Sequence, residues 1–556
     1  MKTTIENKVD DTAPALPNTG AAVTGGANSE SAGRGQEGGS LGQDCVNGGS
    51  DGSGGNGGYM EELPAFKVSG VFSSHMVLQR GQHVKIYGFS NRTGMKVTGR
   101  WEKSSNGAAS VLTAEAAVNE DGRFELIFEA VEADRTPSRM TIESEAGSAV
   151  FDDILVGDVW LIGGQSNAEC AVAHCLQADP GVVDSTSEDD NFRLFRQTQA
   201  KAYELRDNCP RPYRDVIDPG WKWARPGKEA ALAFSAIGFY FAKELTAHTD
   251  VPVGLFMMCP GGACLRELMP AELARERGYE TGANMPVGGY YNTLISPAVG
   301  MCFRGQIFFQ GESEGIWKEM AYSYHEDLKA FVSDQRARFG VGFPFYNVQL
   351  SSYRDEGSAF FPYLNVVRLR QFDAQKIIPD SHLAVSRDLG SLPDDSDWAH
   401  SPHKKELGRR LAAQIYAYEY AEGADNRISD PADYESPVPE SYSRSEDGYE
   451  IRFGYAGSGL RAATAGTGTD SGTVANRATP AGTLVKGFAV YAAGEEQPVP
   501  AEAYIVTNDT VRVICGKDAA AIGYAAFHRA YIEDADLTNG SGLPAPAFRL
   551  DVTERS

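Results

Sequence analysis

The sequence predicts an α/β protein in which a parallel sheet is flanked by β-rich modules. Strand-like apolar runs alternate with helical periodicity over residues 153–422, a pattern typical of a parallel α/β sheet. Short β-like runs separated by turn signals occupy residues 59–152 and 423–556 and predict β-sandwich-like modules. The last region is either a second module or completes the first one in space. Residues 1–58 are rich in Gly, Ser and Asn and are expected to be disordered, because they offer too little apolar surface to offset the entropy of ordering.

Hydrophobic periodicity places the main elements of the α/β region. Strands are expected at Val156–Ile162, Val253–Met258, Gly305–Phe309, Phe345–Val348 and His382–Val385. Helices are expected at Phe234–Ala247, Tyr322–Phe339 and Lys404–Tyr420. Residues 181–230 are turn-rich and polar and predict a long excursion that carries Trp221 and Trp223.

Length and charge restrict the function classes. At 556 residues the chain is long enough for roughly two to four domains. The formal charge of 51 − 75 = −24 disfavours nucleic acid and anionic membranes as partners. No run approaches the roughly 20 apolar residues of a membrane span, and the start of the chain shows no export signal, so a cytoplasmic location is expected. The oligomeric state cannot be predicted.

The cysteines predict neither disulfides nor a metal centre. The eight cysteines are scattered from Cys45 to Cys515 without the spacing of a disulfide or zinc framework. His174 lies beside the pair Cys170 and Cys175, but no second ligand pair follows at a suitable distance. We therefore expect reduced thiols, no metal and no cofactor.

The strongest local signal for chemistry is the stretch that ends at Ser166. An apolar run rich in β-branched residues stops at Gly163-Gly164, and Ser166 follows where a helix is expected to begin. This position presents a hydroxyl at the carboxyl end of a strand, beside backbone N–H groups that a first helical turn leaves unpaired. Ser166 is thus either a nucleophile or simply the cap of the helix.

Three further motifs follow strand ends or precede a helix. Gly261-Gly262 follows the strand at 253–258 and lets the backbone approach a ligand, unless it is a plain turn. Gln310 follows the strand at 305–309; its amide either donates to an oxyanion or is satisfied by the loop. Asp397 lies three residues before His400, a spacing that allows a carboxylate to orient an imidazole. Together with Ser166 these groups supply the nucleophile, base, orienting acid and donors of acyl transfer.

Several sequence blocks resemble one known family in the same order. Gly164-Gln165-Ser166-Asn167, Gln310-Gly311-Glu312-Ser313 and Asp397-Trp398-Ala399-His400 resemble conserved blocks of the sialate O-acetylesterase-like branch of the SGNH (GDSL-type) hydrolases. The resemblance extends over roughly residues 63–420. It implies a flavodoxin-like SGNH α/β/α sandwich that removes acetyl esters from an acetylated carbohydrate by Ser-His-Asp chemistry, without a metal.

By position, the resemblance implies Ser166 as nucleophile, His400 as base and Asp397 as its orienting acid. The oxyanion donors would be the Ser166 N–H, the Gly262 N–H and the Gln310 side chain.

The chain also departs from the family. It has Ala168 where Met is usual, and residues 263–268 replace a segment that usually contains Trp. The last block places its Asp three rather than two residues before the His, which leaves Asp395 and Asp388 as alternative orienting acids.

Three other functions compete with a sialate-type esterase. An acetylxylan-type esterase would use the same groups on plant polysaccharide fragments. An inactive carbohydrate-binding protein would retain the β-modules, but the joint presence of Ser166, Asp397 and His400 argues against it. A lipase-like esterase would need an apolar lid, and the excursion at 181–230 is polar.

Overall fold

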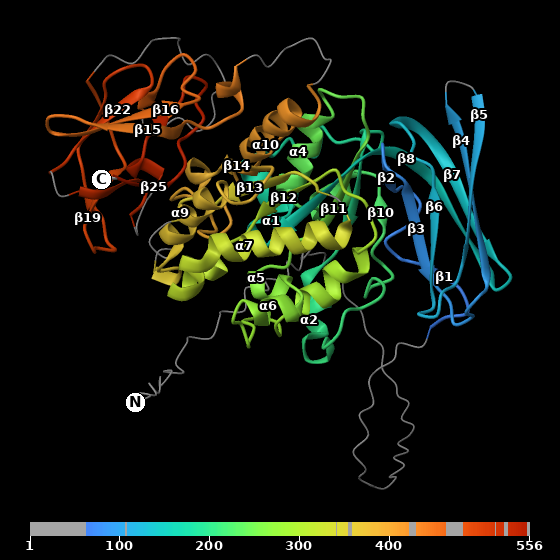
Figure 1. Cartoon of the computed structure of the whole chain (residues 1–556). Coiled ribbons are helices and arrows are strands. Elements are labelled where there is room, and N and C mark those ends of the chain that lie inside the picture. The colour runs from blue at the N-terminus through green and yellow to red at the C-terminus, as the bar shows by residue number, and fades with distance from the viewer. Residues whose placement is uncertain are drawn as a thin grey trace, which may run out of the picture. The chain divides into compact units, whose positions relative to one another are not determined.

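The computed structural model describes residues 63–105, 108–340, 342–353, 359–421, 430–462, 482–516, 519–527 and 532–552 (Figure 1). The expectation of disorder at 1–58 lies outside these residues.

One long strand organises the described chain. β8 (Gly147–Gly164) pairs antiparallel with β7 through its first half and parallel with β11 and β12 through its second half. Asp153 lies between the halves with φ 56°, and its carboxylate accepts hydrogen bonds from His75 and Arg225. From Ile154 onward the strand is almost wholly buried, which explains its uninterrupted apolar sequence. The boundary expected at 152/153 therefore falls inside a single continuous strand.

The central sheet has the order β10-β9-β11-β8-β12-β13-β14. All neighbours from β9 to β14 are parallel, and β10 runs antiparallel to β9 at one edge. Without the two edge strands that the excursion contributes, the order is that of a flavodoxin-like sheet, 2-1-3-4-5. In such a sheet ligands bind beyond the carboxyl ends of the strands at the point where the strand order reverses, here between β8 and β12. The strands of this sheet after β8 are β9 (Phe192–Arg196), β10 (Trp223–Ala224), β11 (Val253–Met258), β12 (Gly305–Phe309), β13 (Phe345–Gln349) and β14 (Ser381–Val385).

Helices cover both faces of the sheet. On one face, Trp160 of β8 packs edge-on against Phe241 of α4, and Tyr346 of β13 donates to Glu419 of α10. On the other face, Phe308 of β12 packs against Phe331 of α7, which crosses the sheet in Figure 1. The main helices are α4 (Ala236–Leu245), α7 (Lys318–Phe339), α9 (Leu364–Ala374) and α10 (Lys404–Glu419), and short ones are α1 (Ser166–Glu169), α2 (Gln199–Glu204), α3 (Lys228–Ala233), α5 (Leu265–Leu268) and α6 (Ala271–Glu276). Among the described helices, none is long and apolar enough to cross a bilayer.

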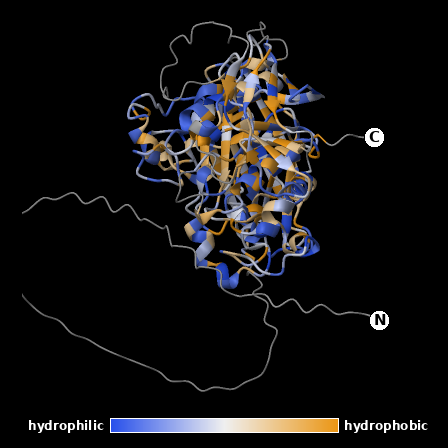
Figure 2. Ribbon diagram, turned by 90° about the vertical axis from the view of Figure 1, so that its left-hand side faces the viewer, coloured by the Kyte–Doolittle hydropathy of each residue, from blue (hydrophilic) through white to orange (hydrophobic). Residues whose placement is uncertain are grey.

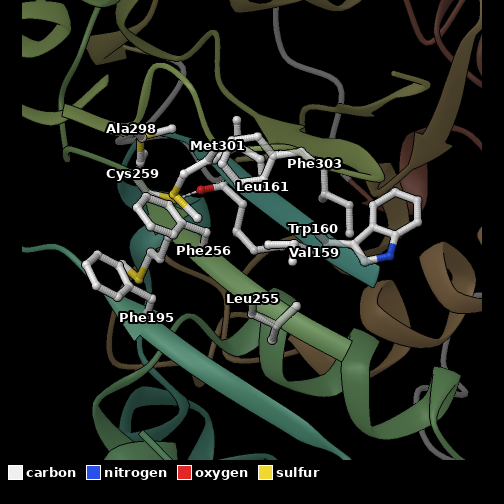
Figure 3. Close-up of a cluster of buried hydrophobic side chains, with 14 of the residues drawn as sticks. Val159, Trp160, Leu161, Phe195, Leu255, Phe256, Cys259, Ala298, Met301 and Phe303 are labelled. Carbon is white, nitrogen blue, oxygen red and sulfur yellow. Dashed lines mark hydrogen bonds between the residues drawn. The ribbon is translucent and has the colours of Figure 1, made fainter. Parts of the chain in front are cut away.

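Aromatic and aliphatic side chains fill the space around β8 and β11. Phe195 and Phe256 stack with ring centroids 4.4 Å apart, and Phe303 meets Phe256 edge-on (Figure 3). At the carboxyl end of the same strands, the Cys259 thiol donates to the Ile162 carbonyl at 3.0 Å. Hydrophobic residues gather in the interior strands and hydrophilic residues on the outer helices and loops (Figure 2). This well-filled core holds the strand ends that carry the candidate active site.

The N-terminal region forms two facing sheets. One has the order β1-β3-β6, and in the other β4 pairs with β5 and β7, while β7 pairs with the first half of β8. Trp101 of β4 packs edge-on against Phe128 of β6, which places both sheets around one core, as expected for a sandwich. The strands are β1 (Lys67–Val68), β2 (Val77–Gln79), β3 (Val84–Phe89), β4 (Lys96–Ser105), β5 (Ala108–Ala117), β6 (Arg123–Phe128) and β7 (Asp134–Ser144).

The C-terminal region has a sandwich of its own, with sheets ordered β15-β16-β22-β21-β18 and β20-β19-β23-β25. Phe453 of β16 contacts Phe548 of β25 across its core. It therefore does not complete the N-terminal sheets. The side-chain amide of Gln349 in β13 donates to the Ala547 carbonyl and accepts from the Ala547 N–H, which joins this sandwich to the central sheet. The strands are β15 (Val438–Arg444), β16 (Gly448–Gly454), β17 (Arg461–Ala462), β18 (Thr483–Val485), β19 (Phe488–Ala492), β20 (Val499–Pro500), β21 (Ala503–Ile505), β22 (Thr510–Ile514), β23 (Ala519–Tyr524), β24 (Leu537–Thr538) and β25 (Phe548–Asp551).

The five strands and three helices expected in the α/β region all form, with ends shifted by a few residues in most cases. Inside the excursion, however, β9 joins the central sheet directly beside β11. The sequence missed it because the run Phe192-Arg193-Leu194-Phe195-Arg196 carries two arginines. Arg193 is nevertheless buried and lies 3.5 Å from the Asp153 carboxylate, which explains its tolerance inside a sheet.

Gly164→Ala should destabilise the protein by about 2–5 kcal/mol, because Gly164 has φ +136° and an added Cβ would lie 2.1 Å from the Phe309 carbonyl oxygen. Urea denaturation followed by fluorescence measures the change. Gly181→Ala is the matched control, since a Cβ there meets nothing within 4 Å. Equal midpoints for the two variants would show that the turn after β8 tolerates a side chain.

Candidate active site

Ser166 begins helix α1 immediately after β8. The N-cap of this helix is Gln165, whose N–H donates to the Phe309 carbonyl at 3.0 Å, so the turn is fastened to the end of β12. Because Ser166 occupies the first helical position, it does not cap the helix. Its side chain is partly exposed, and within the described chain neither its hydroxyl nor its N–H has a hydrogen-bond partner. Both groups are therefore available to a ligand.

The loop before α10 carries the imidazole. Nδ1 of His400 lies 2.8 Å from Oδ2 of Asp397, and the other Asp397 oxygen accepts the N–H groups of Ala399 and His400 at 2.8 and 3.1 Å. Asp397 thus holds both the ring and the backbone of the histidine. With Nδ1 engaged in this way, Nε2 is the ring nitrogen left for a substrate or a nucleophile.

The two alternative orienting acids have other partners. Asp395 lies 3.2 Å from Nε2 of His403, and Asp388 forms a two-point ion pair with Arg410. Of the three candidate acids, Asp397 is therefore the one that pairs with His400, at a spacing of three residues. His403 also has a carboxylate partner, so spacing to an acid does not by itself distinguish the two histidines.

Asn167 joins the serine turn to the histidine loop. Its amide nitrogen lies 3.0 Å from the Ala399 carbonyl, 2.7 Å from Glu312 Oε1 and 2.9 Å from the Tyr353 hydroxyl. Its amide oxygen accepts from the buried Lys404 ammonium at 2.6 Å. The residue after Ser166 is thus bonded to the residue before His400. This tether places the hydroxyl and the imidazole at the same edge of the sheet.

His174 also contacts the histidine loop. Its Nε2 lies 2.6 Å from the His400 carbonyl oxygen, and the two rings meet edge-on with centroids 6.4 Å apart. Within the described ranges, no three His, Cys, Asp or Glu side chains come together as metal ligands would.

The Asp397–His400 pair shifts the pKa of both members. Burial opposes a charge on His400, but the hydrogen bond and negative charge of Asp397 outweigh it and raise the pKa of His400 above its ordinary value. Burial also opposes a charge on Asp397, yet the same hydrogen bond and the two backbone donors lower the pKa of Asp397 well below its usual range. Asp397 is therefore ionised at neutral pH and stabilises a protonated imidazole.

Gly262 supplies a second free backbone donor near Ser166. It adopts φ +70°, and a Cβ added to its neighbour Gly261 would lie 3.5 Å from Ser166 Cβ. The Gly262 carbonyl accepts from Asn284 at 2.7 Å and from Ser313 at 2.9 Å, whereas its N–H has no partner within the described residues. The predicted donors Ser166 N–H and Gly262 N–H are thus both unoccupied.

Gln310 differs from the expectation. Its side chain is fully buried, and its amide nitrogen lies 2.9 Å from the Ala263 carbonyl and also contacts Glu314 and Gln165. Its amide oxygen accepts from Tyr324 at 3.0 Å. Both N–H groups are used by the protein, so this geometry does not offer Gln310 as an oxyanion donor. It corresponds instead to the alternative of an amide satisfied within the fold.

Aromatic rings lie beside the histidine loop. Trp398 is partly exposed and meets Tyr353, Phe360 and Phe361 with ring centroids 6.2–6.3 Å apart. Tyr353 in turn donates to Glu312 at 2.9 Å, next to Asn167. The aromatic cluster of Tyr353, Phe360, Phe361 and Trp398 thus borders the candidate catalytic groups. The sequence did not predict it, because three of its members follow β13, far from Trp398 in the chain.

Residues 156–417 match the model of a family described as carbohydrate esterase, sialic acid-specific acetylesterase. The chain is 23% identical over 334 residues to the sialate O-acetylesterase of Homo sapiens, an alignment that covers 54% of this chain and 60% of the human protein. It is 22% identical over 414 residues to the sialate O-acetylesterase of Mus musculus, with 64% and 74% covered. The chain thus spans 60% of the length of its human relative.

A solved structure confirms the fold class. A carbohydrate acetylesterase from Xanthomonas citri superposes with a TM-score of 0.69 at 24% identity, over 88% of this chain and all of that protein. The resemblance drawn from the sequence blocks is likewise confirmed by the family model. Residues 156–417 are thus similar to the carbohydrate esterase family of sialic acid-specific acetylesterases.

Proposed function

We propose that this protein is a serine esterase that removes O-acetyl groups from a carbohydrate. One observation carries the proposal: an ionised Asp397 orients His400, and Asn167 ties this loop to the helix that begins with Ser166. The proposed nucleophile, base and orienting acid thereby lie at the same carboxyl edge of a parallel sheet, where two unoccupied N–H groups lie nearby. The family match supports acetyl esters of sugars as the substrate class.

The reaction proceeds in two stages. His400 Nε2 takes the proton of the Ser166 hydroxyl as Oγ attacks the acetyl carbonyl carbon, and the N–H groups of Ser166 and Gly262 stabilise the resulting oxyanion. Collapse of this intermediate breaks the ester bond, and His400 returns the proton to the departing sugar oxygen. Water then attacks the acetyl-enzyme with His400 as base, which releases acetate and restores Ser166.

Trp398 supports a sugar as the leaving group. Its partly exposed ring lies beside Tyr353 and belongs to the same loop as His400, two residues before it, so an apolar sugar face has an aromatic surface to contact there.

A panel of acetylated sialic acid, acetylated xylan and acetylated monosaccharides, with acetate release as the readout, tests the function. Ser166→Ala should lower kcat by roughly 10⁶-fold while the circular dichroism spectrum stays unchanged. Release from xylan alone would favour the acetylxylan-type alternative. No release from any member, or activity that persists in Ser166→Ala, would refute the proposed mechanism.

His400→Ala should reduce kcat nearly as much as Ser166→Ala, because it removes the base for both stages. His403→Ala is the matched control from the same loop, and it should retain most of the activity. Steady-state kinetics on one soluble acetate ester rank the two variants. The reverse ranking would assign the base to His403 and its partner Asp395.

Asp397→Asn should lower the pKa of His400, since the carboxylate is what raises it. His400 must be neutral to act as the base, so kcat/KM of the wild type falls as the pH drops through this raised pKa. In the variant the pKa is lower, and the fall in kcat/KM should therefore move to lower pH. The plateau of kcat should also drop by about 10⁴-fold. Asp395→Asn is the control and should leave the position of the fall unchanged. An unmoved profile in Asp397→Asn would mean that another group sets it.

Trp398→Ala should raise KM for an acetylated sugar about tenfold or more, because an aromatic contact surface for the ring is lost. KM for a small acetate ester such as p-nitrophenyl acetate should change little. The ratio of the two KM values separates sugar binding from a general disturbance of the loop. Equal changes for both substrates would exclude a sugar contact at Trp398.

A further inference from the structure

Two side chains hydrogen-bond to the backbone of Gly261. Its N–H donates to Oε2 of Glu169 at 3.0 Å, and its carbonyl oxygen accepts from Nε2 of Gln199 at 2.6 Å. Both contacts lie next to the nucleophile, because a Cβ at Gly261 would meet Gln199 at 2.8 Å, Glu169 at 3.0 Å and Ser166 Cβ at 3.5 Å. No side chain other than hydrogen fits between these groups without displacing one of them.

The hydrogen bond to the Gly261 carbonyl determines where the N–H of Gly262 points. The carbonyl of Gly261 and the N–H of Gly262 belong to one planar trans peptide, in which the two groups point in opposite directions. A donor that holds the carbonyl oxygen therefore also fixes the direction of the Gly262 N–H. The following peptide is held as well, through the hydrogen bonds of Asn284 and Ser313 to the Gly262 carbonyl.

Glu169 and Gln199 come from different parts of the chain. Glu169 ends the short helix that Ser166 begins, and it is partly buried against the glycine loop. Burial raises the pKa of Glu169 to about 7, while the Gly261 N–H bond opposes this by favouring the carboxylate. Gln199 is the first residue of α2, inside the excursion, and its amide also reaches the Tyr290 hydroxyl at 3.2 Å.

We infer that Glu169 and Gln199 are positioning residues that hold the Gly261–Gly262 peptide so that the Gly262 N–H faces the developing oxyanion. The inference rests on the proposed esterase function. It assigns a role to the excursion, which delivers Gln199 to the site. It also assigns to the glycine loop the donation to the oxyanion that was expected of Gln310, whose own amide is already hydrogen-bonded within the protein.

Gln199→Ala and Glu169→Ala should each lower kcat by about 10–100-fold, less than the full loss of an oxyanion donor, because the N–H remains but is no longer held. KM should change less than about twofold, since the bond strengthens mainly in the transition state. Glu169→Gln should recover most of the activity, because its amide oxygen can accept the same N–H. Lys201→Ala, on the same helix as Gln199 but paired on the surface with Glu204, is the control and should match the wild type.

A double variant gives an independent readout. Because both side chains hold one peptide, the loss in Glu169→Ala/Gln199→Ala should be clearly smaller than the product of the two single losses. The inference is overturned if the single variants keep kcat, if KM rises in step with any loss, or if the two losses multiply. Wild-type activity and its abolition in Ser166→Ala are measured alongside. If the wild type releases no acetate, the proposed function fails; if only the predicted changes in these variants are missing, the positioning role alone fails.

Discussion

The arrangement of the active site depends on the hydrogen bonds of the Asn167 side chain. One amide contacts groups beside three different elements: Glu312 after β12, Tyr353 after β13, and Ala399 and Lys404 before and at the start of α10. Since Asn167 directly follows Ser166, these bonds locate the segments after β12 and β13 and the histidine loop relative to Ser166. In a buried network each bond matters more than on the surface, because a lost partner leaves an unsatisfied polar group.

The same network explains why charged side chains are buried here. Lys404 and Glu312 are both almost inaccessible, and the amide of Asn167 lies between them with its oxygen toward the ammonium and its nitrogen toward the carboxyl group. Burial raises the pKa of Glu312, and the bonds from Asn167 and Tyr353 partly offset this. Burying such groups costs free energy, so they are a poor source of stability. They do favour one arrangement of the loops over others, because any other arrangement would leave them unpaired. For a reaction that needs reacting atoms placed to a fraction of an ångström, this rigidity is the benefit.

The parts outside the flavodoxin-like sheet contribute to the site in unequal ways. The N-terminal sandwich shares β8 with the central sheet, so the strand that ends at the serine turn is anchored at both ends. The excursion adds β9 at the edge of the sheet and carries Gln199 to the glycine loop. The C-terminal sandwich binds β13 through Gln349, at the end of the strand that precedes Tyr353. Each addition thus supports a different loop of the site.

Local sequence signals were sufficient for the strands and helices of the α/β region, for the serine turn and for the Asp397–His400 pair. Periodicity indicates burial along one element, the two glycines indicate a turn that no side chain fits, and the carboxylate lies three positions before its imidazole. The orientation of Gln310, the tether through Asn167 and the grip of Glu169 and Gln199 on Gly261 were decided only by the tertiary structure. The side-chain partners of Asn167 lie between 145 and 237 residues away from it in the chain. Glu169 and Gln199 lie 92 and 62 residues before Gly261. A side-chain amide forms its bonds with whichever donors and acceptors the folded chain brings within reach, and no spacing along the sequence records which those are.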